Sequence, residues 1–261
     1  MQKYTSEDLA KFEQDENGYI ICPAGDYTAI KDFPARCRFG ECCGFGEQCS
    51  FGKQCSFGER CGFGKQCSFG EGCSFGEGCS FGEWCGFGEW CGFGEGCSFG
   101  KWCRFGGCCS FGARCSFGEW CSFGEGCSFG ECCGFGEWCS FGEGCSFGEM
   151  CSFGKRCGFG EECRFGEGCS FGEGCSFGEM CQCEGGHEFT RLFTVGYIGT
   201  RNDATQFWLL ADGGILVRCG CFCGSLDEFA AQVKTTHGDS QYGKEYAAAI
   251  ELARVHFGIR E

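Results

Sequence analysis

A cysteine stands at every sixth position from Cys37 to Cys181, 25 times without a miss. Phenylalanine keeps the same period over residues 39–177 and glycine over residues 40–178, with 24 occurrences each. The repeating unit is Phe-Gly-Glu-x-Cys-Ser, in which Lys sometimes replaces the Glu, and Gly or Arg sometimes replaces the Ser. Self-similarity at a short, fixed period predicts a solenoid, in which each unit buries its apolar side only against its neighbours.

The unit itself favours strand over helix. In Cys-Ser-Phe, an extended backbone points Cys and Phe to one side and Ser to the other. We expect the following Gly to give the backbone the freedom to turn a corner, and the Glu beyond it to face water. A helix is not expected, because a period of six matches no helical stripe and would insert a Gly every sixth residue.

With these residues, the array resembles the hexapeptide repeat of left-handed parallel β-helices. That repeat has an aliphatic residue, Gly, two variable residues, a small residue and one more variable residue. Phe takes the aliphatic place and Cys the small one, over more than half of the chain. The resemblance implies a β-solenoid across residues 37–183. The family prefers Ile, Val or Leu where this chain has Phe, so the cross-section and the handedness stay open.

Two coil lengths fit a six-residue unit. Three units would close a three-sided coil, with a spacing of 18 between equivalent positions, and two units would close a flat, two-sided coil with a spacing of 12. The variable position before each Cys favours 18, because four of the five Trp of the array then share one column, whereas a spacing of 12 scatters them over both columns. That column reads Gln48, Gln66, Trp84, Trp102, Trp120, Trp138, Arg156 and Gly174.

The position before this column also agrees with the three-sided coil. It reads Glu47, Lys65, Glu83, Lys101, Glu119, Glu137, Lys155 and Glu173. Interleaved Lys relieves the repulsion that stacked carboxylates would otherwise have at the spacing of neighbouring strands. We therefore predict about eight three-sided coils, which form a rod of roughly 40 Å at ~4.8 Å per coil.

The sequence on either side of the array is not repetitive. Residues 1–36 predict an N-terminal cap with a short helix near 6–14, because the open end of a solenoid exposes unpaired strand edges. Residues 187–261 predict a small α+β domain. Its expected elements are strands at 189–198, 205–210 and 215–223, a turn at 201–203, and helices at 225–235 and 241–257.

Two stretches of this domain are similar to an uncharacterised domain of phage and prophage genes. They are Gly-Tyr-Ile-Gly-Thr-Arg-Asn-Asp at 196–203 and Gly-Cys-Phe-Cys-Gly-Ser-Leu-Asp-Glu-Phe at 220–229. The resemblance implies a viral origin and no particular activity.

Charge and hydropathy limit the kinds of partner and the cellular location that we expect for this protein. The net charge of −15 opposes direct binding to nucleic acid or to an anionic membrane, and no apolar run is long enough to predict a membrane span. The N-terminal stretch up to Tyr19 is polar and lacks the apolar segment of a signal peptide. We therefore expect the protein in a cytoplasm, or in a virion if it is phage-encoded, with its 33 Cys as thiols.

The sequence offers little chemistry. Hexapeptide β-helices include acyltransferases, and the resemblance would imply a His between neighbouring β-helices. His187, His237 and His256 all lie outside the array, and its unbroken period leaves no insertion loop to form an acceptor site. We expect no catalytic residue, no enzymatic activity and no cofactor.

The cysteines are expected to fill the core without binding metal. A spacing of six does not match the more closely spaced Cys pairs that are typical of zinc sites, and buried free Cys behaves as a small hydrophobe. Cys219, Cys221 and Cys223 alternate along a predicted strand, so we expect all three on one buried face.

The Trp column is the candidate binding surface. Trp84, Trp102, Trp120 and Trp138 are predicted to face outward, and a contiguous patch of exposed aromatics is typical of an interface. Lys101 lies beside Trp102 and makes this side less acidic than the others. We therefore predict self-association through these five residues, as a homodimer.

The leading hypothesis is a non-enzymatic structural or interaction protein, a rigid solenoid rod that presents a small α+β binding domain. The alternative is an acidic decoy, a nucleic-acid mimic that inhibits a host DNA-binding protein. It rests on a nearly unbroken acidic column, namely Glu41, Glu59, Glu77, Glu95, Glu131, Glu149 and Glu167. A charged surface that keeps the rod in solution explains the same Glu residues.

Overall fold

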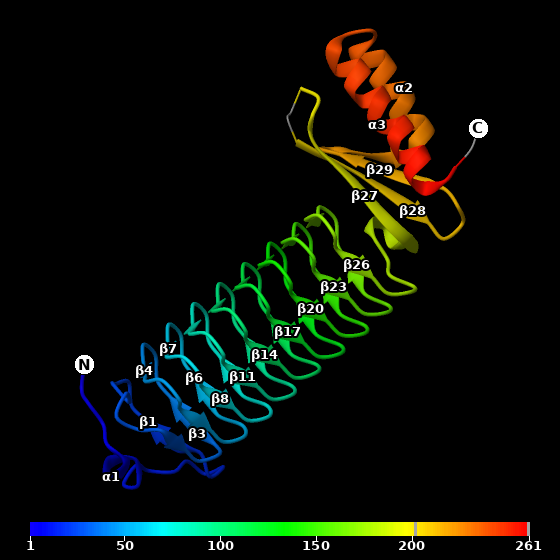
Figure 1. Ribbon diagram of the computed structural model, residues 1–261. Helices are drawn as coiled ribbons and strands as arrows, with labels where there is room; N and C mark the ends of the chain where they lie inside the picture. The colour runs from blue at the N-terminus through cyan, green and yellow to red at the C-terminus, as the bar shows by residue number, and fades with distance from the viewer. Residues whose placement is uncertain (201–202, 260–261) are drawn as a thin grey trace. The chain divides into compact units, whose positions relative to one another are not determined.

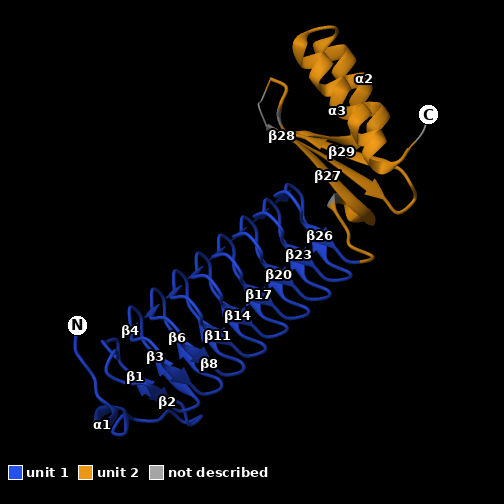
Figure 2. Ribbon diagram, in the orientation of Figure 1, with its two compact units in different colours: residues 1–178 blue, residues 179–261 orange. Residues whose placement is uncertain are grey.

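The computed structural model describes residues 1–200 and 203–259. The chain divides into two compact units, Met1–Gly178 and Glu179–Glu261, and each is described by itself (Figure 2). Residues 201 and 202 of the expected turn at 201–203 lie outside the described residues.

The first unit is a three-sided parallel β-solenoid (Figure 1). Each coil gives one short strand to each of three parallel sheets, and each strand pairs with the equivalent strand of the next coil, as Phe81 does with Phe99. The prediction of three-sided coils with a spacing of 18 is confirmed, and the two-sided coil is wrong. The strands form about nine coils, because residues before the repeat join the sheets.

The three sheets have nine, eight and nine strands. The first contains β1 (Ile20–Cys22), β3 (Cys37–Phe39), β6 (Ser56–Phe57), β9 (Ser74–Phe75), β12 (Gly92–Phe93), β15 (Ser110–Phe111), β18 (Ser128–Phe129), β21 (Ser146–Phe147) and β24 (Arg164–Phe165). The second contains β4 (Gly44–Phe45), β7 (Gly62–Phe63), β10 (Ser80–Phe81), β13 (Ser98–Phe99), β16 (Ser116–Phe117), β19 (Gly134–Phe135), β22 (Ser152–Phe153) and β25 (Ser170–Phe171). The third contains β2 (Asp32–Phe33), β5 (Ser50–Phe51), β8 (Ser68–Phe69), β11 (Gly86–Phe87), β14 (Arg104–Phe105), β17 (Ser122–Phe123), β20 (Ser140–Phe141), β23 (Gly158–Phe159) and β26 (Ser176–Phe177).

The N-terminal segment continues the core with different residues. Helix α1 (Ser6–Leu9) is shorter than predicted and begins at a capping box made by Thr5 and Asp8. Tyr27 is fully buried and stacks on Phe45 at 5.4 Å between ring centroids, and Tyr4 stacks on Tyr27 at 5.0 Å. These two rings therefore extend one phenylalanine stack beyond the repeat and close its end.

The core of the solenoid is three stacks of phenylalanine rings. Phe81 stacks on Phe99 with a centroid distance of 4.8 Å and an interplanar angle of 3°. It also meets Phe75 and Phe87, its neighbours along the chain, edge to face at 5.0 and 5.1 Å. Parallel rings in contact at about 3.5 Å but 4.8 Å between centroids are displaced sideways, which is a favoured aromatic geometry. The phenylalanines of the core therefore combine both kinds of favourable ring contact.

The glycine after each Phe has a different role from the one expected. Its φ is not positive; instead, it lies against the backbone of the preceding coil. A Cβ on Gly58 would stand 2.7 Å from the backbone nitrogen of Glu41, and one on Gly94 would stand 2.7 Å from that of Glu77. Only glycine allows the coils to approach this closely.

The left-handed backbone conformation falls on the variable residue before each Cys. All 25 of these positions, from 36 to 180, have positive φ, and 18 of them are not glycine. For an L-residue this conformation costs on the order of 1–2 kcal/mol. The amide nitrogen at this position, as in Arg60, donates to the carbonyl of the Glu position one coil later, Glu77, at 2.8 Å. The strained turn is therefore held by hydrogen bonds between coils.

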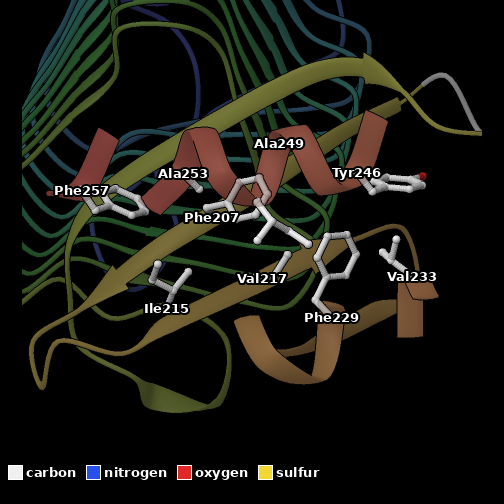
Figure 3. Packing of buried hydrophobic residues seen from close by; sticks show 10 residues of the cluster. Phe207, Ile215, Val217, Phe229, Val233, Tyr246, Ala249, Ala253 and Phe257 are labelled. Carbon is white, nitrogen blue, oxygen red and sulfur yellow. The ribbon is translucent and has the colours of Figure 1, made fainter. Parts of the chain in front are cut away.

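The second unit is an antiparallel sheet covered by two helices. Its order is β27 (Phe189–Ile198), β28 (Asp203–Leu210), β29 (Ile215–Cys219) and β30 (Phe222–Ser225). A short 3-10 turn, η1 (Glu184–Gly186), precedes it, and helices α2 (Leu226–His237) and α3 (Gln241–Phe257) follow. Phe207 and Val217 of the sheet pack against Phe229, Tyr246 and their neighbours on the helices (Figure 3).

The predicted strand over 215–223 is wrong in one respect. A tight turn at Gly220, with φ of 61°, splits it into β29 and β30, which pair with each other. Cys219 is therefore partly buried, while Cys221 and Cys223 are exposed. The expectation that the three thiols share one buried face is also wrong, because alternation along a strand does not continue through a hairpin.

Two substitutions in one turn test the two backbone constraints. We expect Gly58→Ala to destabilise the protein by about 2–3 kcal/mol, because the added Cβ overlaps the neighbouring coil. We expect Arg60→Gly, two positions further on, to raise stability by about 1 kcal/mol, because it removes left-handed strain at an exposed side chain. Thermal unfolding followed by circular dichroism measures both. Opposite shifts are expected, and a lower melting temperature for Arg60→Gly would contradict the strain argument.

Candidate functional site

The Trp column forms a continuous stack on the surface of the solenoid. Trp84, Trp102, Trp120 and Trp138 stack in turn with centroid distances of 4.9–5.0 Å and interplanar angles of 3–5°. Their side chains remain 37–50% exposed. We refer to these four residues as the Trp ladder. The sequence prediction of one shared, outward-facing column is therefore correct as geometry.

From Trp84 to Arg156, the faces that the rings turn toward one another are covered, and the ladder exposes mainly the edges of its rings. Each inner indole lies between two others, and the guanidinium of Arg156 covers Trp138 at 4.7 Å from the ring centroid. A sugar ring or a nucleobase that binds by stacking needs a free aromatic face. The ladder instead offers a strip of ring edges about four coils long, a surface suited to packing against another protein.

Polar side chains extend the same column in the N-terminal direction. The amide of Gln48 donates a hydrogen bond to the amide oxygen of Gln66 at 3.1 Å, one coil later. The role of Arg156 as a cap for the ladder was not predicted from the sequence. Its position directly after Trp138 in the same column was the available signal.

Lys101 lies in the column next to the ladder, which we call the charged column: residues 47, 65, 83, 101, 119, 137, 155 and 173. The ammonium of Lys101 pairs with the Glu119 carboxylate at 3.0 Å, one coil away. Lys65 with Glu83 and Lys155 with Glu173 repeat this pair, each at 3.1 Å. All are exposed, so each contributes little to stability. Three Lys among five Glu nevertheless make this side less acidic than the column that begins at Glu41, which has seven Glu and Ala113.

One other Trp is an internal comparison for the ladder. Trp90 also has positive φ and is 63% exposed. Its column neighbours one coil away are Gly72 and Cys108, so it has no indole above or below it. The chain therefore contains a stacked and an unstacked Trp in the same local backbone conformation.

The cysteines inside the coils form three further columns. All 33 Cys are reduced thiols, and 26 of them are buried. Each thiol in the middle of a column donates to the carbonyl of a Gly in the preceding coil, as Cys103 does to Gly82 at 3.5 Å. Cys is thus small enough for the position and also satisfies a carbonyl oxygen, which an Ala at that position would leave unpaired.

The thiol of Cys103, in the middle of one column, is protected from reaction. The neighbouring Cys121 thiol and burial away from water raise the pKa of Cys103 to about 12, from an ordinary 9.0, against an opposing effect of the Cys85 thiol. The thiolate is the reactive form, so such a group is almost entirely unreactive near neutral pH. The extra cysteines in the turns differ: Cys42 and Cys132 are exposed, and Cys108 is partly exposed.

The remaining candidate groups lie in the second unit. His256 lies against the guanidinium of Arg191 and stacks on Phe193, and His237 packs near Tyr242 and Tyr246. In the described part of the chain, neither imidazole forms a hydrogen bond or an ion pair with a carboxylate. No group of three or more His, Cys, Asp or Glu over residues 1–200 and 203–259 is arranged to hold a metal ion.

Comparison with known proteins gives no relative. No protein family, curated protein or solved structure matches this chain. The helices in the described residues are too short or too polar to cross a lipid bilayer.

The buried thiol of Cys103 predicts a loss of stability in alkali. Between pH 9 and about 12 an unfolded Cys103 releases its proton while the folded one retains it, so the folded state binds more protons. The contribution of this thiol to stability therefore falls as pH rises through this window, by up to ~1.4 kcal/mol per pH unit. Urea unfolding at pH 8, 9 and 10 with a reductant present measures the slope.

Cys103→Ala is the control for this slope. It creates a small cavity and lowers stability at pH 8, but its alkaline slope is expected to be shallower by the contribution of one thiol. Equal slopes in the variant and the wild type would show that the buried thiol does not titrate as described.

Proposed function

We propose that this protein is a non-enzymatic structural or interaction protein, in which a rigid solenoid carries a small α+β domain and associates with a second copy through the Trp ladder. The observation that carries the proposal is the exposed stack of Trp84, Trp102, Trp120 and Trp138. Large exposed aromatics in a contiguous patch are the residues that dominate interface energetics.

The spacing of the ladder favours a second copy as the partner. Its rings repeat every 4.9–5.0 Å over four coils, and a partner that contacts all of them must repeat at the same distance. Another solenoid of this chain meets that requirement without further assumptions. A twofold dimer is the commonest assembly of identical chains.

The absence of enzymatic activity is part of the proposal. It is supported by the regularity of the coils: the period from Cys37 to Cys181 has no insertion that would build a loop over the solenoid. The finer identity, a left-handed hexapeptide β-helix from a phage, rests on the sequence resemblances alone. The location in the host cytoplasm or in the virion stays a prediction from the sequence.

The acidic decoy is the weaker alternative. The array from Cys37 to Cys181 has ten Lys and Arg against 19 Glu, a net charge of −9 over about eight coils. At the 4.8 Å repeat of the core, this is roughly one net negative charge per 4 Å, whereas double-stranded DNA carries one per about 1.7 Å. The array therefore has less than half the charge density of the polymer that it would imitate.

The interface is tested by light scattering on a Trp102→Glu, Trp120→Glu double variant. We expect the wild type to be a dimer and this variant a monomer, because two buried carboxylates would face the partner's ring edges. Trp90→Glu is the control: it places one carboxylate in an equivalent turn outside the ladder, and it should remain dimeric.

The result that would overturn the interface is the same oligomeric state for wild type and double variant. Circular dichroism on all three proteins checks that the fold is intact, which is expected because these side chains are on the surface. Capture of a DNA-binding protein by the full chain, lost at high salt, would favour the decoy.

A further inference from the structure

The order of charges beside the Trp ladder specifies how two copies meet, given the dimer proposed above. From the N-terminal end, the charged column reads Glu, Lys, Glu, Lys, Glu, Glu, Lys, Glu. We propose that the two solenoids associate antiparallel, face to face, with the twofold axis at the coil of Glu119 and Trp120.

Symmetry decides which columns face each other. In an antiparallel pair, the twofold axis lies in the plane of contact, between the solenoids, and is perpendicular to the long axes of both. Rotation about it reverses the direction of the chain but keeps each column on the same lateral side. The Trp ladder therefore faces the partner's Trp ladder, and the charged column faces itself in reverse order. In a parallel pair, the rotation moves the charged column to the opposite side, and it does not meet its own copy.

With the axis at Glu119, opposite charges face each other in all three pairs that the column forms, and only Glu47 at its N-terminal end has no partner within the column. The pairs are Lys101 with Glu137, Glu83 with Lys155, and Lys65 with Glu173, and symmetry gives each pair twice. Glu119 faces its own copy on the axis. In the ladder, Trp102 faces Trp138, and Trp84 faces Arg156.

Registers half a coil away lose this complementarity. If the axis lies half a coil towards the N-terminus, between Lys101 and Glu119, three of the four pairs have like charges: Glu83 with Glu137, Lys65 with Lys155, and Glu47 with Glu173. If it lies half a coil towards the C-terminus, between Glu119 and Glu137, all three pairs within the column have like charges: Glu119 with Glu137, Lys101 with Lys155, and Glu83 with Glu173. Facing like charges oppose the wrong arrangement as strongly as opposite charges favour the right one. A shift by a whole coil, to an axis at Glu137, keeps only two opposite-charge pairs, Glu119 with Lys155 and Lys101 with Glu173, against three for the axis at Glu119. The column therefore favours the register centred on Glu119.

Two neighbouring glutamates are then predicted to act in opposite directions. Glu119→Gln removes the repulsion on the axis and also frees Lys101, its partner within the chain, to pair with Glu137 of the second copy. We expect it to strengthen the dimer about threefold. Glu137→Gln removes an attractive pair twice and is expected to weaken the dimer about fivefold.

Sedimentation equilibrium on the full chain measures both dissociation constants, at about 50 mM salt and again at about 500 mM, where screening should shrink both effects. The two variants make the same chemical change one coil apart, so each is the control for the other. Effects of the same sign would overturn the proposed register. The Trp double variant decides the interface separately, so a wrong register and a wrong interface give different results.

A zero-length carbodiimide cross-link tests the same geometry directly. In a mixed sample of ¹⁴N- and ¹⁵N-labelled chains, we expect a cross-link between Lys101 of one isotope and Glu137 of the other. The contradicting result is a link from Lys101 of one chain to Glu83 or Glu119 of the other chain, with no link to Glu137. It would overturn the antiparallel register centred on Glu119.

Discussion

The constraint on which this structure depends is that every residue of the repeat lies directly over its equivalent in the next coil. Parallel, in-register strands impose this alignment, as in the pairing of Phe81 with Phe99. Each side chain in the repeat therefore lies next to the equivalent side chain of the neighbouring coil, and equivalent aromatic rings are 4.8–5.0 Å apart. Aromatic rings gain from that geometry because they stack, whereas carboxylates are repelled by it. The phenylalanine core, the Trp ladder and the interleaved Lys all follow from one alignment.

Coil-to-coil approach adds a second constraint, on the backbone. The Gly after each Phe is required because the neighbouring coil leaves no room for a Cβ. The position two places later has positive φ and yet is usually not glycine. The strained conformation at that position persists because its amide donates a hydrogen bond to a carbonyl of the next coil, which fixes the turn. This permits large side chains such as Trp84 at a conformation that an isolated turn would give to glycine, and it is why the ladder lies on a corner of the solenoid.

The sequence was sufficient for the coil, the register and the Trp ladder, because each is a direct consequence of a fixed period. The sequence led to the wrong reason for the glycines, which was freedom to turn a corner. Their actual role is to avoid contact with backbone atoms of the preceding coil, which are distant along the chain. A signal for the strained turn was present: seven of the 25 positions before a Cys, such as Gly72 and Gly96, are glycine. In the second unit, the Gly220 hairpin was missed because the alternating Cys219, Cys221 and Cys223 imitate a continuous strand. The contact of Arg156 with Trp138 could have been predicted by reading the column one position beyond its last Trp.

The same alignment also explains why recognition by this solenoid is linear. In a stacked column the neighbouring rings cover each other's faces. Trp102 and Trp120 therefore offer a partner only their edges, at a fixed repeat. A small ligand would contact one or two such edges and gain little. A second solenoid contacts all of them at once, and each added coil repeats the same contact without further loss of rotational freedom. What distinguishes one register from another is then not the aromatic ladder, which is nearly uniform, but the irregular order of Lys and Glu beside it. The regular part of the repeat supplies contact area, and its irregularities supply specificity.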